Sequence, residues 1–322
     1  MTIVVTGGAG FLGHHLVKLL LEKGKSVVVM DSLWTGSQEN IAEFASNPNF
    51  RHILCDVREP LPDVEDLEQI YHLACPASPD DFERAPIEIL ETCFLGTRNV
   101  LELATVRRAR VLLASTSEVY GDPEISVLPE SYRGNVNSFG PRSCYDEGKR
   151  TLEALAFSYR LKNNVETRIA RIFNAYGPYM ASKDGRAVPN FIGAAMDGQP
   201  VKIYGDGSAT RCFQYATDCV EGLYALMNSD YDKPVNIGSD LEMTVFDIAN
   251  KVTRAVAEKL GQKAPVAVHY LPKRVDDPIR RKPDITLAGK VLGWSPKVSL
   301  DDGIAQTVDW FLEKHGGPKS LM

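Results

Sequence analysis

The sequence lacks the patterns that mark several special classes of protein. Its six cysteines form no Cys-x-x-Cys pair and no metal-ligand spacing, so we expect reduced core thiols and no metal site. No apolar run approaches the roughly 18 residues that a membrane span requires. The net charge is −6 and no run of like charge exceeds Arg280–Lys282, so a basic surface for nucleic acid is not expected.

What the chain does contain is the composition of an ordinary globular protein. Hydrophobic residues make up 44% of its 322 positions and charged residues 24%, which is enough apolar material for a sizeable core. The segment Met1–Val5 already has the pattern of a strand and not of a cleavable leader. We therefore expect a cytoplasmic protein.

Short apolar runs alternate with longer amphipathic segments along the chain. We expect strands at Ile3–Val5, Val27–Met30, Ile53–Cys55, Ile70–Ala74, Val111–Ala114 and Thr167–Ile172. We expect helices near Phe11–Lys23, Ile87–Ala104, Tyr145–Lys162, Thr244–Leu260 and Asp301–Lys314. The stripe of the first helix that should face the sheet consists of Leu12, Leu16, Leu19, Leu20 and Lys23. The alternation predicts an α/β fold, a doubly wound parallel sheet of the Rossmann type.

The composition and spacing of the segments change after about Tyr176. Glycine and proline punctuate the segments that follow, as in Gly198–Pro200 and Gly205–Gly207. We therefore expect one domain over residues 1–175 and a smaller one over residues 176–322, with segments near 211–240 returning to the first.

A glycine-rich turn, Thr6–Gly13, separates the first expected strand from the first helix. Glycines at such a turn let the backbone bend sharply and approach a pyrophosphate, which then faces the helix N-terminus. A tight turn without a ligand is the alternative, but the complete strand, turn, helix, strand and Asp favour a dinucleotide. The expected contacts in the turn are Gly7, Gly10, Phe11, Leu12 and Gly13.

Carboxylates follow the second and third expected strands. Asp31 lies 18 residues after Gly13, where it could bind a ribose diol and repel a 2′-phosphate. No Arg follows within Ser32–Gln38, so NAD is favoured over NADP as the cofactor of the first domain. Asp56, followed by Val57, could contact the adenine amino group, although a helix cap or turn Asp is an equally good interpretation.

Tyr145 and Lys149 are four residues apart, which places them on one face of a helix, and we expect both to contact the cofactor as well as to take part in catalysis. A neighbouring ammonium stabilises phenolate and lowers the pKa of a Tyr toward that of a useful general base. Such pairs are also common on surfaces, but Thr116 and Glu118 follow a strand end, where ligands of open α/β sheets bind. Thr116 could hold a sugar hydroxyl. Glu118 could shuttle a proton or be an ordinary loop carboxylate.

Several motifs together give the chain a family resemblance. They are His72–Pro79, Ser115–Asp122, Tyr145–Arg150, Arg171–Pro178, Asp206–Tyr215 and Asp276–Asp284. The sequence resembles the extended short-chain dehydrogenases/reductases from residue 1 to about residue 314, and within them the UDP-glucuronate decarboxylases. The glycine turn and the Tyr-x-x-x-Lys pair are shared by the whole superfamily, whereas STSEVYGD, YDEGKR and RRKPD together are far more selective.

The resemblance implies an NAD-dependent lyase that converts UDP-glucuronate to UDP-xylose. Tyr145, assisted by Lys149 and Thr116, would take the proton of the sugar 4-hydroxyl while hydride leaves C4. The resulting 4-keto acid would lose CO2, and hydride would return, so that NAD is regenerated. The resemblance makes Glu118 the candidate for positioning or protonation at C5.

Two related reactions are the alternatives to decarboxylation. The 4,6-dehydratases of the family place Asp before the Glu, where this chain has Ser117, and that Asp expels the 6-hydroxyl. The 4-epimerases usually lack the Glu. The pair Ser117–Glu118 therefore fits decarboxylation better than 4,6-dehydration or 4-epimerisation.

The resemblance also assigns residues to the substrate. Arg211 and Arg281 match positions that grip the diphosphate, which guanidinium groups recognise well. Asn174 matches a nucleotide-sugar contact, and Tyr204 lies in the segment of the uracil pocket. Arg142 is our candidate for the substrate carboxylate, with a structural salt bridge as an even alternative. Without the resemblance, the basic run of Arg281 would be interpreted as solvated surface.

The chain departs from the family at two positions. The family usually has Asn where Cys93 stands and Tyr where Phe82 stands; the two departures bear on the substrate preference and leave the expected fold unchanged. A homodimer formed by the helices near Ile87–Ala104 and Tyr145–Lys162 is expected by resemblance, with a UDP-sugar as the other partner.

Overall fold

The structure is a computed structural model that describes residues 1–182, 184–263, 265–273 and 279–316. Its centre is a seven-stranded sheet in the order β11-β6-β5-β4-β1-β2-β3, and every pairing in it is parallel. The strands are β1 (Thr2–Thr6), β2 (Ser26–Asp31), β3 (Phe50–Leu54), β4 (Leu67–His72), β5 (Arg110–Thr116), β6 (Thr167–Ile172) and β11 (Val235–Ile237). The predicted α/β fold with a parallel sheet is confirmed.

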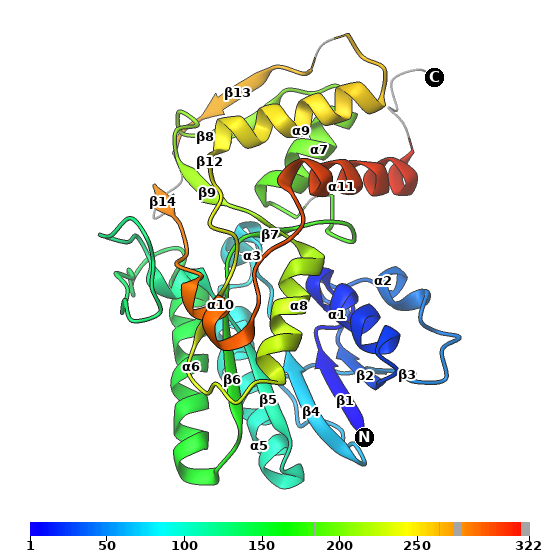
Figure 1. Cartoon of the computed structure of the whole chain (residues 1–322), viewed down its shortest axis with the longest axis vertical. Coiled ribbons are helices and arrows are strands. Elements are labelled where there is room, and N and C mark those ends of the chain that lie inside the picture. The colour runs from blue at the N-terminus through cyan, green and yellow to red at the C-terminus, as the bar shows by residue number, and fades with distance from the viewer. Residues whose placement is uncertain (183, 264, 274–278, 317–322) are drawn as a thin grey trace.

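Helices cover both faces of this sheet, because successive strand residues point to opposite sides. On one face lie α1 (Phe11–Glu22) and α8 (Ala216–Met227), in a core that takes Val27 and Val29 from β2. On the other face lie α5 (Thr97–Arg107) and α6 (Ser143–Asn163), in a core that takes Val28 and Met30 from the same strand (Figure 1). The two cores therefore sandwich the sheet.

The helix expected over Ile87–Ala104 is not one regular α-helix. It consists of α4 (Pro86–Glu91), a π-helical turn η1 (Thr92–Gly96) and α5. Short helices α2 (Gln38–Ala42) and α3 (Pro79–Arg84) and the 3₁₀ turn η2 (Ser117–Tyr120) were not predicted. Periodicity cannot reveal a π-helical turn, because one inserted residue leaves the helical spacing on either side almost intact.

The buried face of α1 also differs from the predicted apolar stripe. Leu16 and Leu20 are fully buried as expected, but Lys23 is exposed. His14 and His15 are buried instead. Burial of the two rings is possible because each has a ring nitrogen hydrogen-bonded to a backbone carbonyl. His14 Nδ1 lies 2.6 Å from the carbonyl oxygen of Asn40, and His15 Nε2 lies 3.0 Å from that of Pro178.

A second group of elements lies beyond the carboxyl ends of the strands, where α7, α9 and α11 gather (Figure 1). The helices of this group are α7 (Ala187–Met196), α9 (Val245–Lys259) and α11 (Leu300–His315), whereas α10 (Thr286–Leu292) packs against α8 and β11 in the sheet layer. The strands are β7 (Ala175–Tyr176), β8 (Val201–Tyr204), β9 (Thr210–Cys212), β10 (Gln214–Tyr215), β12 (Glu242–Thr244), β13 (Val268–Leu271) and β14 (Arg280–Arg281). Residues of α7, α9 and α11 form a core of their own.

Within the described residues, no helix combines the length and the apolar character that crossing a membrane demands.

Candidate active site

A cavity of about 1240 Å³ lies between the carboxyl edge of the sheet and the second group of elements. Its wall combines the glycine turn, the ends of β2 and β5, the start of α6 and residues of β8, β9 and β14. A parallel sheet places its ligand sites at this edge, because loops from several strands end there together. The cavity is therefore the candidate active site.

The glycine turn forms one end of the cavity with a backbone that side chains would obstruct. Gly7 has φ +73°, and a Cβ on it would lie 2.7 Å from the Ala74 backbone nitrogen. A Cβ on Gly13 would lie 2.0 Å from the Gly7 carbonyl oxygen. Gly10 caps α1, so the free N–H groups of the helix start face the cavity that Phe11 and Leu12 also line.

Asp31 lies at the same end, and backbone groups fix its carboxylate. Ala9 N donates to Oδ2 over 2.9 Å and Leu33 N donates to Oδ1 over 2.8 Å. Burial raises the pKa of Asp31, whereas the two N–H donors oppose that rise. The carboxylate is thus held against the glycine turn, where an adenosine ribose would lie if the turn binds a pyrophosphate.

Asp56 and Val57 also line the cavity, beyond the end of β3. Asp56 Oδ1 accepts a hydrogen bond of 2.9 Å from Arg58 N, and Oδ2 pairs with the Arg58 side chain at 2.7 Å. Hydrogen bonding to Arg58 lowers the pKa of Asp56. Asp56 therefore has the turn role that the sequence analysis considered as an alternative, and it also faces the cavity.

Tyr145, Lys149 and Thr116 meet at the centre of the cavity, although two come from α6 and one from the end of β5. Lys149 Nζ donates to the Ala114 carbonyl over 2.8 Å and lies 5.7 Å from the centre of the Tyr145 ring. Burial opposes the charge of Lys149, yet Cys75, Tyr145 and Cys93 raise its pKa, so the side chain remains an ammonium.

The pKa of Tyr145 differs from the sequence-based expectation in its net direction. Burial raises this pKa, and Lys149 and a hydrogen bond with Thr116 only partly offset the rise. The expected influence of Lys149 is present but smaller than the cost of placing phenolate in a buried site. Tyr145 is therefore a protonated phenol at neutral pH.

Glu118 is held between two arginines from distant parts of the chain. Arg142 Nη2 lies 2.7 Å from Glu118 Oε2, and Arg281 Nη2 lies 2.8 Å from the same oxygen, while Arg281 Nη1 contacts Oε1. Burial alone would raise the pKa of Glu118, but Arg281 and Arg142 lower it to about 2. The carboxylate is ionised, and the salt bridge considered for Arg142 exists with this partner.

The remaining predicted substrate residues also face the cavity. Arg211 and Arg281 are register partners on β9 and β14, and both are buried. Asn174 follows β6 and Tyr204 ends β8. Of the motif Asp276–Asp284, residues 276–278 lie outside the described part of the chain. The fold thus brings together residues that are far apart in the sequence.

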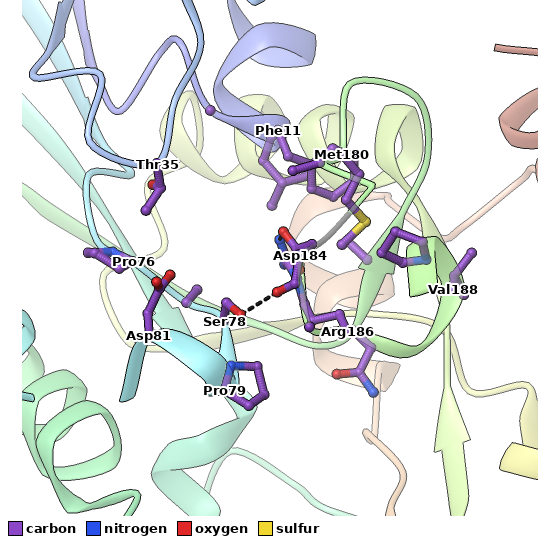
Figure 2. A pocket seen from close by; sticks show the side chains of 18 of the residues that line it. Phe11, Thr35, Pro76, Ser78, Pro79, Asp81, Met180, Asp184, Arg186 and Val188 are labelled. Carbon is purple, nitrogen blue, oxygen red and sulfur yellow. Dashed lines mark hydrogen bonds and ion pairs between the residues drawn. The ribbon is translucent and has the colours of Figure 1, made fainter. Parts of the chain in front are cut away.

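Two further groups lie in the cavity wall: Phe82, which the sequence analysis noted as a departure from the family, and the group of Ser78, Asp184 and Arg186, to which it assigned no site role. The Phe82 ring stacks on Tyr145 with centroids 4.8 Å apart, and Arg142 Cζ lies 5.4 Å from the Phe82 ring. Across the cavity, Ser78 Oγ donates to the Asp184 carbonyl, and Arg186 Nη2 lies 2.7 Å from Asp184 Oδ2 (Figure 2). For Asp184 and Arg186 the sequence signal was the turn glycine between them, which has φ +85°, whereas Ser78 lies in the family motif His72–Pro79.

Metal ligands do not gather in this cavity or elsewhere among the described residues, since no group of three His, Cys, Asp or Glu side chains could hold an ion there.

Comparison with known proteins yields both a family and close relatives. A family profile described as GDP-mannose 4,6 dehydratase matches residues 4–307. The chain is 48% identical to UDP-glucuronic acid decarboxylase 2 of Arabidopsis thaliana over 314 residues, which is 98% of this chain and 69% of that protein. It is 46% identical to UDP-glucuronic acid decarboxylase 1 of Danio rerio over 96% of this chain and 72% of that protein.

A solved structure shares the whole architecture. The dTDP-glucose 4,6-dehydratase of Streptomyces venezuelae, with NAD bound, matches with a TM-score of 0.88 and 29% identity, covering 98% of each chain. The resemblance inferred from the sequence motifs is confirmed.

Proposed function

Because the chain belongs to the NAD-dependent epimerase/dehydratase family, the extended short-chain dehydrogenases/reductases, we propose that it decarboxylates UDP-glucuronate to UDP-xylose. The observation that carries the proposal is Glu118, held as an anion by Arg142 and Arg281 in the cavity that contains Tyr145 and Thr116. The 48% identity to a decarboxylase over 98% of the chain supports it.

NAD is the cofactor in this proposal. The residues assigned to it fit the group: the Gly7–Gly13 turn lines the cavity in a tight bend that a Cβ on Gly7 or Gly13 would prevent by colliding with neighbouring backbone, and Asp31 presents a fixed carboxylate that a 2′-phosphate would meet with repulsion. Asp56 and Val57 are assigned to the adenine end. Bound NAD supplies the hydride acceptor for oxidation at C4 and the hydride donor for the return step.

The first step that the chain's own residues perform is proton removal at the sugar 4-hydroxyl. Tyr145 is the base, Thr116 orients the hydroxyl, and the Lys149 ammonium stabilises phenolate. Since burial keeps the Tyr145 phenol protonated, its proton must pass to water in the cavity before the step, and the Lys149 ammonium stabilises the phenolate that results.

Loss of CO2 follows from the chemistry of a 4-keto acid. The carbon–carboxylate bond is β to the ketone, so its electrons pass into the ketone as an enolate. The Tyr145 phenol, now protonated, can donate a hydrogen bond to the enolate oxygen. The enolate takes a proton from water at C5 before hydride returns to C4. Because Glu118 is ionised, we assign it to positioning Arg142 at the sugar carboxylate and Arg281 at the diphosphate, and not to storing a proton for C5.

The other substrate residues are assigned to the parts of UDP-glucuronate by matching arginines to its anionic groups and neutral side chains to its nucleotide. Arg211 and Arg281 face the diphosphate, Arg142 faces the sugar carboxylate, and Asn174 and Tyr204 face the nucleotide. In this proposal residues 1–175 form the NAD-binding domain, with segments near 211–240 returning to it, and residues 176–322 form the sugar-nucleotide domain, to whose ligand Arg142 and Asn174 of the first domain also contribute contacts.

Product analysis tests the proposed reaction. The purified protein is incubated with NAD and UDP-glucuronate, and released CO2 and UDP-pentose are measured together. We expect both in equal amounts. Intact or 4-epimerised UDP-hexuronate without CO2 would refute decarboxylation and support the epimerase alternative. A dehydratase is disfavoured because Ser117, which is buried, is a poor proton donor for expelling a hydroxyl.

A homodimer is the proposed assembly. Apolar side chains are exposed on α4, η1 and α6, which pack side by side; they are Ile87, Leu90, Phe94, Phe157 and Leu161. Exposed apolar residues gathered on adjacent helices are typical of a protein interface. Light scattering on the wild type should give twice the chain mass, and Phe157→Asp with Leu161→Asp should give one chain mass.

A further inference from the structure

Two thiols contact each other in the wall of the cavity. Cys75 Sγ and Cys93 Sγ are 3.5 Å apart. Cys75 lies three residues beyond β4, lines the cavity and is less buried than Cys93. Cys93 is buried behind it in the π-helical turn η1, where a Cβ on Gly148 of α6 would lie 3.0 Å from Cys93 Sγ. The pair therefore consists of a thiol that lines the cavity and a more deeply buried one.

The charges around Cys75 favour its thiolate. A hydrogen bond with Cys93 lowers the pKa of Cys75 to about 7, and the Lys149 ammonium contributes to the shift although burial opposes it. A thiolate is the nucleophilic form of cysteine, and a nearby cation stabilises it.

The same cavity contains a natural comparison for Cys75. Cys55 also lines it, but at the end that contains Asp31 and Asp56. Burial and these two carboxylates raise the pKa of Cys55 to about 11. Cys55 has no thiol neighbour among the described contacts, so it lacks both the cation and the partner that Cys75 has.

We propose that Cys75 and Cys93 form a peroxide-reactive thiol pair in which Cys75 attacks the oxidant and Cys93 completes a disulfide. The Cys75 thiol displaces water from hydrogen peroxide and becomes a sulfenic acid, so that sulfur is oxidised and the peroxide is reduced. Cys93 then attacks that sulfur, the S–O bond breaks, and a second water leaves. The two steps convert two thiols and one peroxide into one disulfide and two waters.

Closing the disulfide must disturb the catalytic residues. A disulfide is about 2.05 Å long, so the sulfurs must approach by roughly 1.5 Å. Cys75 begins the segment that leads to α3, whose Phe82 stacks on Tyr145. Cys93 packs against Gly148, the residue before Lys149. The displacement reaches both sides of the pair Tyr145 and Lys149, so we expect turnover to fall on oxidation.

Peptide mapping of the NAD-loaded protein tests the proposal without relying on its activity. The reduced protein is treated with hydrogen peroxide, the remaining thiols are alkylated, and the peptides are analysed without reduction. We expect a linked peptide pair containing Cys75 and Cys93, while Cys55 stays alkylatable. No such pair, or oxidation of Cys55 as fast as that of Cys75, overturns the proposal.

Variants separate the roles of the two thiols. In Cys93→Ser, dimedone should trap a sulfenic acid at Cys75, whereas Cys75→Ser should give neither the adduct nor the linked pair. Cys144→Ser is the matched control, because Cys144 is also close to this cluster, and it should still form the pair. A disulfide between Cys75 and Cys144 in the oxidised wild type, in place of one between Cys75 and Cys93, would contradict the assignment.

The effect on turnover is a separate measurement. Wild type should lose at least fivefold in turnover when oxidised and recover it with dithiothreitol, and Cys75→Ser should resist the loss. Equal inactivation of Cys75→Ser overturns the link between the disulfide and activity. If no turnover of UDP-glucuronate is found at all, the proposed function fails, but the peptide map still decides the thiol chemistry.

Discussion

The two ends of the cavity are built in different ways. The end with the glycine turn and Asp31 comes from one continuous stretch of chain, β1 to β2, and its contacts are hydrogen bonds from backbone N–H groups to a side chain, such as Ala9 N to Asp31 Oδ2. The end with Glu118 joins residues up to 163 positions apart through arginine side chains. The first end depends on local geometry and the second on the packing of two groups of elements.

This difference predicts how substitutions should behave. A change at the local end should alter cofactor affinity and leave the chemistry of bound cofactor intact. A change at the other end, or in the centre between them, should alter turnover with the cofactor still in place. The following experiments test that separation, beginning with the largest expected effect.

Tyr145→Phe should have the largest effect, because it removes the only group of the centre that can take the 4-hydroxyl proton in our proposal. We expect turnover to fall by about 10²–10⁴-fold, the usual contribution of general acid–base catalysis. NAD content, measured on the denatured protein, should not change. Tyr159→Phe on the same helix is the control and should retain activity, since Tyr159 contacts Glu102 outside the cavity.

Glu118→Gln should reduce CO2 release by about 10²-fold, which is within the range for a group that acts on proton transfer or positioning. The neutral amide leaves two arginines without their shared anion, so both can take other partners. UDP affinity, measured by calorimetry, should change by less than tenfold. The exposed Glu124→Gln is the control. Full turnover in Glu118→Gln would reject the role of the carboxylate.

Asp31→Ser should act on the other end and lower NAD affinity by about tenfold, as expected for lost hydrogen bonds to a charged group. Rejection of NADP should weaken as well, because the repelling carboxylate is gone. Saturating NAD should restore turnover, which titration of activity against NAD would measure. Asp56→Asn should weaken NAD binding less, because Arg58 already occupies this carboxylate. If Asp56→Asn lowered NAD affinity as much as Asp31→Ser, the result would instead favour a contact between Asp56 and the adenine.

Asp146→Asn should have the smallest effect, visible in stability. Burial and the neighbouring Glu118 raise the pKa of Asp146 to about 7. A carboxyl whose pKa is raised on folding contributes stability that is present below about pH 4 and is lost as pH rises to about 7. The melting temperature of Asp146→Asn relative to wild type should therefore rise between pH 4 and pH 8. A constant difference would contradict this shift.

The fold was predictable because its signals are local. The expected strand Val27–Met30 is a short buried run and lies within one residue of β2 at each end, whereas β3 and β4 each begin three residues before the expected Ile53 and Ile70. Two details of the helices were not predictable. The π-helical turn η1 interrupts an otherwise regular helical period, and the buried His14 and His15 depend on carbonyls of distant residues.

Sequence by itself determined the residue types of the site and the end of the sheet where they gather. The glycine turn, Asp31 and the pair Tyr145 and Lys149 follow from spacing, because each is a relation between near neighbours on one strand or helix. It also supplied the family resemblance that pointed to Glu118.

Only the tertiary structure decided which charges meet. It joined Arg142 and Arg281 to Glu118, stacked Phe82 on Tyr145 and brought Cys75 to Cys93. Burial then set the protonation states, raising the pKa of Tyr145, whereas the arginines overcame burial at Glu118. Desolvation and long-range pairing depend on the surroundings of a side chain in space, and no spacing along the chain encodes them directly.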